Sequence, residues 1–233
     1  MIKFIKRTIK LIILLVFLAA TFVVWQGYRM YNNAIQEQPL DEKVQEIQEQ
    51  QGYTSIFQLP EIYQNAVIAV EDHRFRQHPG IDPIAIGRAV KNNIKSKSLS
   101  EGGSTITQQL AKNLYFSQEK ELTRKVAETF MALKLEREYT KDEILELYVN
   151  TIYFGEGYYG ICAASEGYFG VEPDQMDDYE STMLAGLPNA PSAYSLTDHA
   201  ELAEKRQRIV LAAMVKYGYI TQQRADQLSQ QGG

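Results

Sequence analysis

The sequence is poor in the residues that form disulfides and most metal centres. Cysteine occurs once, as Cys162, which excludes an internal disulfide and any site built from several cysteines. Histidine occurs three times, as His73, His78 and His199, at spacings that match no metalloprotease motif. A nucleotide-binding fingerprint is also lacking. Because Cys162 lies in the small, apolar segment 160–164 (GICAA), we expect it to be a buried thiol without a redox role.

Internal repeats and strong strand-pairing signals are absent too, and we therefore predict a mainly α fold. The 233 residues are enough for one sizeable domain and an anchor. The apolar fraction of 45% and the charged fraction of 23% are ordinary for a globular protein.

Acidic residues are missing from the first 31 positions, which hold five lysines and arginines. The whole chain carries a net charge of −5, so residues 32–233 carry −10, which argues against a general nucleic-acid-binding role. Residues 11–25 are apolar except for one threonine, and four cations precede them. Because basic residues stay on the cytoplasmic side, we expect the N-terminus inside and the body outside. A cleaved signal peptide is the alternative, but no small-x-small cleavage site follows the apolar run.

These patterns predict a domain order. We expect a cytoplasmic basic tail over 1–10, a transmembrane anchor over 11–28, a polar stalk over 29–52, a catalytic body over 53–228 and a short tail over 229–233. Within the body, periodicity and end signals predict helices over 81–99, 119–138, 143–150, 163–168, 177–187 and 200–217, with a capping box at Thr140 and a helix N-cap at Thr221. The alternating aromatics and glycines of segment 152–160 could form a strand, but we expect a loop and a short helix.

One candidate catalytic group is Glu71, where the apolar run 66–70 ends in the two adjacent acids Glu71 and Asp72. A carboxylate at the rim of an apolar core can act as a general base near neutral pH. The alternative is an ordinary helix end with solvated charges.

A second candidate region is residues 100–113 (SEGGSTITQQLAKN). The glycine pair allows a turn, after which Ser104 or Thr105 can cap a helix and leave N–H groups for a phosphate. On that helix Thr105, Gln109 and Lys112 share one side, as do Gln108 and Lys112. The spacing is not that of a P-loop, so we interpret the segment as a cradle for a polar head group.

A second carboxylate, Glu128, follows a basic cluster of Lys120, Arg124 and Lys125. Surface salt bridges are one interpretation. The other is a diphosphate site, because the cluster can neutralise a diphosphate while Glu128 stays ionised. Two carboxylates, a cationic cluster and an outward-facing anchor together predict glycosyl transfer from a lipid-linked sugar diphosphate.

Five blocks of the sequence resemble, in order, the motifs of the peptidoglycan glycosyltransferases of family 51, in their monofunctional, membrane-anchored form. The blocks are residues 71–80 (EDHRFRQHPG), 103–113 (GSTITQQLAKN), 124–128 (RKVAE), 141–150 (KDEILELYVN) and 206–211 (RQRIVL). The segments 153–155 (YFG) and 184–192 (LAGLPNAPS) are also similar, and the resemblance covers about residues 58–226.

The resemblance implies a lysozyme-like helical domain with a smaller, membrane-associated jaw, which we place at 81–99. It implies that Glu71 takes the proton of the acceptor hydroxyl while lipid II is polymerised into glycan and undecaprenyl diphosphate leaves. Glu128 would assist, with a divalent cation such as Mg²⁺ or Mn²⁺ as its possible ligand and no organic cofactor. The implied substrate-binding residues are Asp72, Phe75, Ser104, Thr105, Gln108, Gln109, Lys112, Asn113, Lys120, Arg124 and Lys125.

The implied partners are lipid II, the growing lipid-linked glycan, the bacterial cytoplasmic membrane and separate transpeptidases or other cell-wall synthases, with no nucleic acid. The catalytic domain would lie on the extracytoplasmic face. Two alternatives stay open at this stage, namely a lysozyme-like glycan hydrolase and an inactive, membrane-tethered scaffold for cell-wall assembly.

Overall fold

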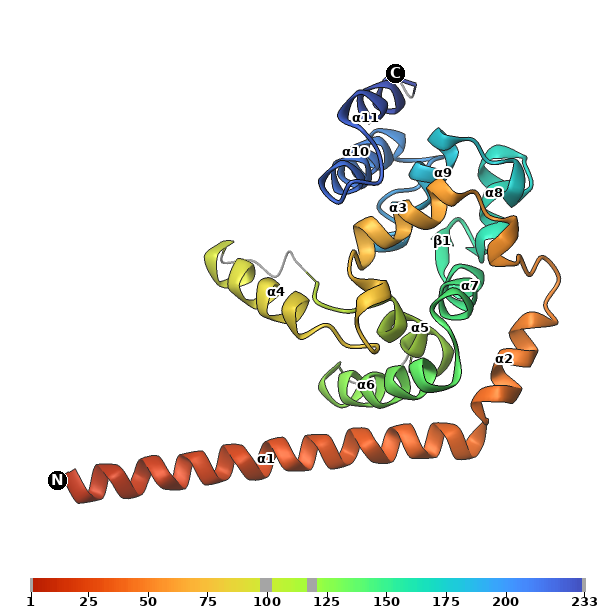
Figure 1. The fold of residues 1–233 in the computed structure, drawn as a ribbon. Coiled ribbons are helices and arrows are strands. Elements are labelled where there is room, and N and C mark those ends of the chain that lie inside the picture. The colour runs from red at the N-terminus through yellow and green to blue at the C-terminus, as the bar shows by residue number, and fades with distance from the viewer. Residues whose placement is uncertain (1, 97–101, 117–120, 232–233) are drawn as a thin grey trace.

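The computed structural model describes residues 2–96, 102–116 and 121–231 and is mainly α-helical, as predicted (Figure 1). The α-helices are α1 (Ile2–Glu37), α2 (Leu40–Gln48), α3 (Glu61–Glu71), α4 (Pro83–Ser96), α5 (Ile106–Tyr115), α6 (Glu121–Glu138), α7 (Lys141–Thr151), α8 (Ile161–Phe169), α9 (Asp178–Leu184), α10 (Ala200–Lys216) and α11 (Gln222–Ser229). Short 3-10 turns are η1 (Ile56–Gln58), η2 (Phe75–Gln77), η3 (Pro173–Gln175) and η4 (Leu187–Asn189), and the strands are β1 (Tyr153–Gly155) and β2 (Tyr158–Tyr159).

Helix α1 is one long helix whose N-terminal part extends well beyond the rest of the molecule (Figure 1). Its segment Phe4–Glu37 is long and apolar enough to cross a membrane, judged by length and composition. The apolar side chains of residues 11–18 are exposed in the isolated chain. This is compatible with the predicted anchor, because a bilayer would cover such side chains.

The core of the body is formed where α3, α5, α7 and α10 meet. Helix α5 packs between α6 and α7, while α3 packs against α9 and α10. The largest side chains with no exposed surface include Tyr63, Phe75 and Tyr148. The packing brings the end of α3 next to the first turns of α5, and both elements contribute to the site described below.

Several helix ends follow the predicted signals. Thr140 forms the predicted capping box with Glu143 at the start of α7, and Thr221 caps α11. At the start of α5 the cap is Thr105 rather than Ser104, and Gln108 completes its capping box. Cys162 is half-buried rather than fully buried, and burial is the main cause that raises the pKa of its thiol to about 11.

The prediction of a loop and a short helix over 152–160 is wrong. Tyr153 pairs with Tyr159 in a small antiparallel hairpin with an irregular register. Gly155 and Gly157 adopt positive φ angles, which glycine allows without a steric penalty, and Glu156 between them also has a positive φ of 53°. The glycines therefore form a tight reversal instead of ending a helix.

The predicted stalk over 29–52 also differs from the structure. Helix α1 continues to Glu37, and α2 then buries Leu40, Val44 and Ile47 in the main core, next to α7. The sparse apolar residues of this polar segment form the inward face of a short helix, which a composition argument overlooks. The folded body therefore begins before residue 53.

The half-buried apolar side chains Val126 and Phe130 of α6 face α1. The backbones come so close that a Cβ atom on Gly27 would lie 2.4 Å from Val126 Cβ. Further along the two helices, the rings of Tyr28 and Tyr31 of α1 pack on Phe130 of α6 at centroid distances of 5.3 and 5.8 Å. The anchor helix is thus attached along its side to the body.

Helix α4 stands apart from the other helices of the body, as expected for the jaw (Figure 1). Its side chains Ile84 and Ile86 are exposed. The predicted helix over 81–99 begins at Pro83 rather than at residue 81, and residues 97–101 lie outside the described part of the chain. Association of α4 with a membrane stays a prediction.

The close contact at Gly27 gives a stability prediction. Gly27→Ala should lower the unfolding temperature in detergent, because the new Cβ collides with Val126 and overpacking costs about 1–3 kcal/mol. Gly87→Ala in α4 is the matched control, since no atom lies within 4 Å of its added Cβ. It should gain up to about 1 kcal/mol from helix propensity. Equal stabilisation by both substitutions would contradict the close packing of α1 on α6.

Candidate active site

A cleft of about 820 Å³ lies between the end of α3, the jaw helix α4, and helices α5, α6 and α10. Among the described residues that line it, Glu71 is the only acid. Six cationic side chains line the same cleft, namely Arg88, Lys112, Arg124, Lys125, Arg206 and Lys216. The cleft is therefore strongly positive although the chain as a whole is acidic, and such a surface favours an anionic ligand.

Glu71 is the last residue of α3, and each of its carboxylate oxygens is held by a different helix. Gln109 Nε2 of α5 donates to Oε2 at 2.8 Å. Arg206 Nη2 of α10 lies 3.3 Å from Oε1. The carboxylate therefore faces the cleft in a fixed orientation, as a general base requires.

The amide of Gln109 is itself oriented by Tyr148 of α7. The Tyr148 hydroxyl donates to Gln109 Oε1 at 3.2 Å, which leaves the NH₂ group to face Glu71. Complete burial, and secondarily the charge of Glu71, raise the pKa of Tyr148 well above its ordinary value. Tyr148 therefore keeps its proton and remains a donor.

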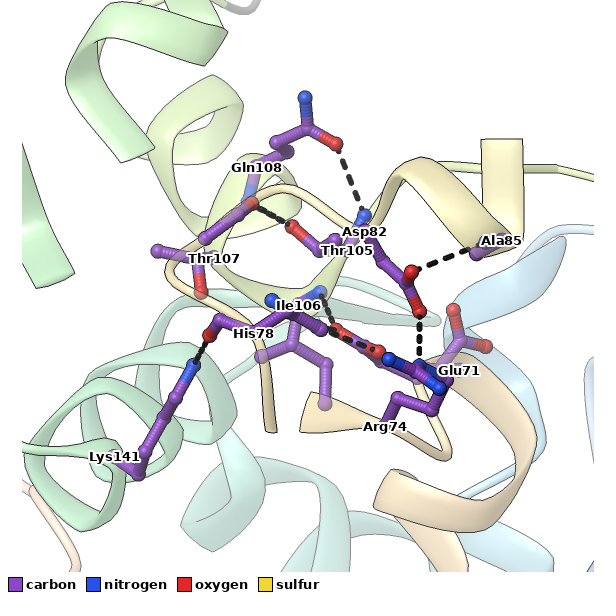
Figure 2. Close-up of polar contacts among 12 residues, drawn as sticks. Glu71, Arg74, His78, Asp82, Ala85, Thr105, Ile106, Thr107, Gln108 and Lys141 are labelled. Carbon is purple, nitrogen blue, oxygen red and sulfur yellow. Dashed lines mark hydrogen bonds and ion pairs between the residues drawn. The ribbon is translucent and has the colours of Figure 1, made fainter. Parts of the chain in front are cut away.

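Asp72 is buried behind Glu71 and connects α3 to α5. Its carboxylate lies 2.9 Å from His78 Nε2 and accepts the backbone N–H of Ile106, in the first turn of α5, at 3.1 Å. Figure 2 shows His78 next to Ile106, the first residue of α5. Asp72 does not line the cleft, and its contacts connect the two elements that carry Glu71 and Gln109.

Asp82 places the start of the jaw helix. It accepts the backbone N–H groups of Ile84 and Ala85 and pairs with Arg74 Nε at 3.0 Å (Figure 2). Burial disfavours its ionised form, but the Ala85 and Ile84 hydrogen bonds and the Arg74 charge outweigh burial, and the pKa of Asp82 lies below its ordinary value. The jaw helix is thus tied to the turn that follows Glu71.

Glu128 is placed differently from the prediction of a second catalytic carboxylate. It is 0% exposed and does not line the cleft. Its two oxygens are held by Arg124 Nε at 3.0 Å and Lys125 Nζ at 2.8 Å. Lys125 also donates to Ser104 Oγ at 2.8 Å. Glu128 therefore orients two cations of the cleft from behind.

The predicted divalent cation does not fit at Glu128. Mg²⁺ binds through carboxylate and phosphate oxygens that are free to face it. Here both carboxylate oxygens already face a guanidinium and an ammonium group, and a cation inserted there would meet two like charges. The geometry of Glu128 is that of a counter-ion.

The structure brings Glu71, Ser104, Gln109, Lys112, Arg124 and Lys125 into one cleft, and their roles toward a substrate stay predictions. Five predicted substrate residues that the structure describes lie outside its lining, namely Asp72, whose contacts are given above, and four more. Thr105 and Gln108 are buried in the capping box of α5, Phe75 is buried under the ammonium group of Lys141, and Asn113 does not line the cleft. Lys120 lies outside the described residues.

Sequence reasoning missed several residues of the cleft. Arg206 lies in the block 206–211, which was noted only for its resemblance. Arg88 and Lys216 come from α4 and α10, and His73 stacks on Tyr217 with ring centroids 4.1 Å apart. Burial, followed by the charge of Arg88, lowers the pKa of His73. No local sequence signal identifies these residues, because only the fold brings α4 and α10 to the same cleft.

A family model described as Transglycosylase matches residues 37–215. Penicillin-binding protein 1A/1B of Bacillus subtilis (strain 168) is 47% identical over 174 residues, which are 74% of this chain and 19% of that protein. Penicillin-binding protein 1A of Escherichia coli (strain K12) is 47% identical over 170 residues, which are 73% of this chain and 20% of that protein.

A crystal structure of penicillin-binding protein 1A from Haemophilus influenzae matches with a TM-score of 0.45 and 21% identity, over 76% of this chain and 17% of that one. The chain spans about a fifth of the length of the curated relatives named above. The matched region 37–215 contains most of the folded body, without α11, and every cleft-lining residue except Lys216 and Tyr217. On this evidence the chain belongs to the transglycosylase family.

Proposed function

We propose that this protein is a peptidoglycan glycosyltransferase that polymerises lipid II into β-1,4-linked glycan strands and releases undecaprenyl diphosphate. The observation that carries the proposal is the cleft itself, in which one oriented carboxylate faces a set of cations. Membership of the transglycosylase family supports the same reaction class.

In the proposed reaction, Glu71 accepts the proton of the acceptor 4-hydroxyl. The oxygen attacks the anomeric carbon of the lipid-linked strand, the bond to the diphosphate breaks, and the configuration inverts. The reaction needs one base, and Glu71 is the only acid that lines the cleft among the described residues. General-base assistance of this kind contributes roughly 10²–10⁴-fold to the rate.

The departing diphosphate gains negative charge as its bond to the sugar breaks. Preorganised cations stabilise such charge without reorganising during the reaction. Lys112, Arg124 and Lys125 are the cations that we assign to this task, and the buried counter-ion Glu128 holds the last two in place.

The attachment of α1 supports a lipid-linked substrate. The apolar run ends at Trp25, and Gly27 touches Val126 of α6. Arg124 and Lys125 lie one or two residues from Val126, which is roughly 3 Å along the helix axis. The cations therefore lie near the level where the apolar part of α1 ends, which is where the diphosphate of a membrane-bound lipid would be found. The basic N-terminus supports an extracytoplasmic position for this level, because basic residues stay on the cytoplasmic side.

A glycan hydrolase is less consistent with the site. Most glycosidases use two carboxyl groups that flank the scissile bond. Of the two carboxylates predicted for this role, only Glu71 faces the cleft, whereas Glu128 is buried. The geometry therefore favours transfer over hydrolysis.

A scaffold without activity is also less consistent with the site, because it would not need a carboxylate that is held at both oxygens, as Glu71 is.

Glu71→Gln should abolish most of the polymerising activity because the amide cannot accept the hydroxyl proton. We expect kcat for lipid II in detergent to fall by roughly 10²–10⁴-fold, with little change in the unfolding temperature. Glu61→Gln is the matched control, since Glu61 starts the same helix and is exposed. Full activity of a folded Glu71→Gln protein would remove this residue as the base.

Glu128→Gln should act through the two cations it holds. We expect the free energy of unfolding to fall by about 1–3 kcal/mol as a charge-assisted interaction is lost, and KM for lipid II to rise. The control is Glu138→Gln on the same helix, where the exposed pair with Lys134 contributes at most about 1 kcal/mol. Unchanged stability and KM, with a loss confined to kcat, would instead indicate that Glu128 takes part in the chemistry.

A further inference from the structure

A second hollow lies between α1 and α6, which pack side by side where the anchor helix is attached to the body (Figure 1). It measures about 470 Å³, and none of its described lining residues lines the catalytic cleft. Helix α1 contributes Tyr28 and Tyr31, and α6 contributes Phe130, Leu133 and Arg137. We call this hollow the seam groove. Its walls combine aromatic rings with a cation.

The seam groove begins close to the end of the apolar part of α1. The apolar run ends at Trp25, and Tyr28 and Tyr31 follow at roughly 4.5 and 9 Å along the helix axis. The headgroup layer of a bilayer extends about 5–8 Å beyond the hydrocarbon on each face, and tyrosine is enriched at this depth. With α1 as the membrane anchor, the groove therefore opens among the phospholipid headgroups.

Helix α6 runs alongside α1 in the same direction. Gly27 meets Val126, and further along both helices Tyr31 packs on Phe130. Later residues of α6 therefore lie further from the hydrocarbon. Residue 137 is about two turns beyond Phe130, which is roughly 10 Å along the helix axis.

The side chain of Arg137 is folded back toward the membrane. Its Nε donates to the backbone carbonyl of Leu133, one turn earlier in α6, at 3.2 Å. Helical side chains in general lean toward the N-terminus of their helix. The guanidinium group therefore lies within about one turn of Phe130 and Tyr31, at a height that the phosphate of a membrane lipid can reach.

The charge of Arg137 is not balanced by the acids beside it in the sequence. Glu136 pairs with Lys141 Nζ at 2.7 Å, and Glu138 pairs with Lys134 Nζ at 2.6 Å. Among the described residues, Arg137 has no carboxylate within ion-pair distance, and its side chain is exposed. An anionic ligand would supply the missing counter-charge, because arginine binds phosphate oxygens through two parallel N–H groups.

We propose that the seam groove binds the headgroup of one anionic membrane phospholipid, with Arg137 on its phosphate and the aromatic rings beside its glycerol unit. The acyl chains stay in the bilayer, next to the exposed apolar side chains of α1. Basic pockets beside membrane helices bind anionic headgroups in this way. The lipid also covers the ring of Tyr28, which is 49% exposed in the isolated chain. The inference depends on α1 as the anchor and not on the proposed reaction.

General attraction between a basic surface and an anionic membrane is the competing explanation. Such attraction depends on the number of cations near the membrane and not on the shape of a groove. Binding in the seam groove requires both the charge of Arg137 and the space between α1 and α6. Removing a charge outside the groove, and filling the groove without changing its charge, therefore separate the two explanations.

The experiment measures lipid binding to the full chain in dodecyl maltoside by native mass spectrometry. Dioleoylphosphatidylglycerol is the anionic probe, dioleoylphosphatidylcholine is the probe without net charge, and sn-glycerol 1-phosphate represents the headgroup without its chains. We expect the first phosphatidylglycerol molecule to bind about fivefold more tightly than phosphatidylcholine, which is the effect of one arginine near a membrane surface. Glycerol phosphate should not bind at the same concentrations.

Arg137→Gln should weaken the binding of phosphatidylglycerol by about fivefold and leave that of phosphatidylcholine unchanged. Lys134→Gln is the matched control, because it removes one cation from the same helix at a residue that does not line the groove. Its lipid binding should equal that of the unmodified protein. Leu133→Trp fills the groove without changing the charge and should also weaken the binding of phosphatidylglycerol.

Equal weakening by Arg137→Gln and Lys134→Gln would indicate general attraction and overturn the inference. Equal affinities for the two lipids, or unchanged binding in either groove variant, would overturn it as well. Glycerol phosphate bound as tightly as the lipid would show a site for free phosphates instead. None of these measurements uses glycan synthesis, so an inactive but lipid-binding protein would refute the proposed function and leave this inference intact.

Discussion

The carboxylate of Asp72 fixes the register between the two elements on which the cleft depends. It accepts the first-turn N–H of α5 at Ile106 and faces the ring of His78, all within the buried interior. Because Asp72 directly follows Glu71, this contact sets where the Glu71 carboxylate lies relative to Gln109, one turn further along α5. A carboxylate at a helix N-terminus is also favoured by the helix dipole. The position of the Glu71 carboxylate is thus determined by the contacts of Asp72, the next residue in the chain.

Charge is distributed in two layers around the cleft. The inner surface is lined by cations and by Glu71, whereas the acid that balances Arg124 and Lys125 lies behind them and out of contact with solvent. This arrangement holds long, flexible side chains in place before a ligand arrives, which reduces the entropy lost on binding. It also explains how an acidic protein can present a positive binding surface.

The sequence predicts the local parts of this architecture better than their assembly. Thr140, Thr221 and the mainly α body follow from spacing and residue type, and Glu71 stands out because an apolar run ends in acids. Thr105 shows where sequence-based prediction ends. Its hydroxyl and the amide of Gln108 have a spacing that suits either a helix cap or a ligand-binding cradle. Only their burial in the fold decides between these two roles. Arg206 and the inward face of α2 depend on contacts between distant segments. The burial of Glu128 could not be predicted either, because it depends on which face of α6 is covered by the rest of the fold.

The side-by-side packing of α1 and α6 has a mechanical consequence. The two helices are in contact where Gly27 meets Val126 and where Tyr28 packs on Phe130, so a change in the tilt of one would be transmitted to the other. A hydrophobic helix adjusts to a thinner or thicker bilayer largely by changing its tilt. With α1 as the proposed membrane anchor, a change of tilt would be carried through α6 to Arg124 and Lys125, and the lipid composition would then set the height and angle of these cations relative to the bilayer.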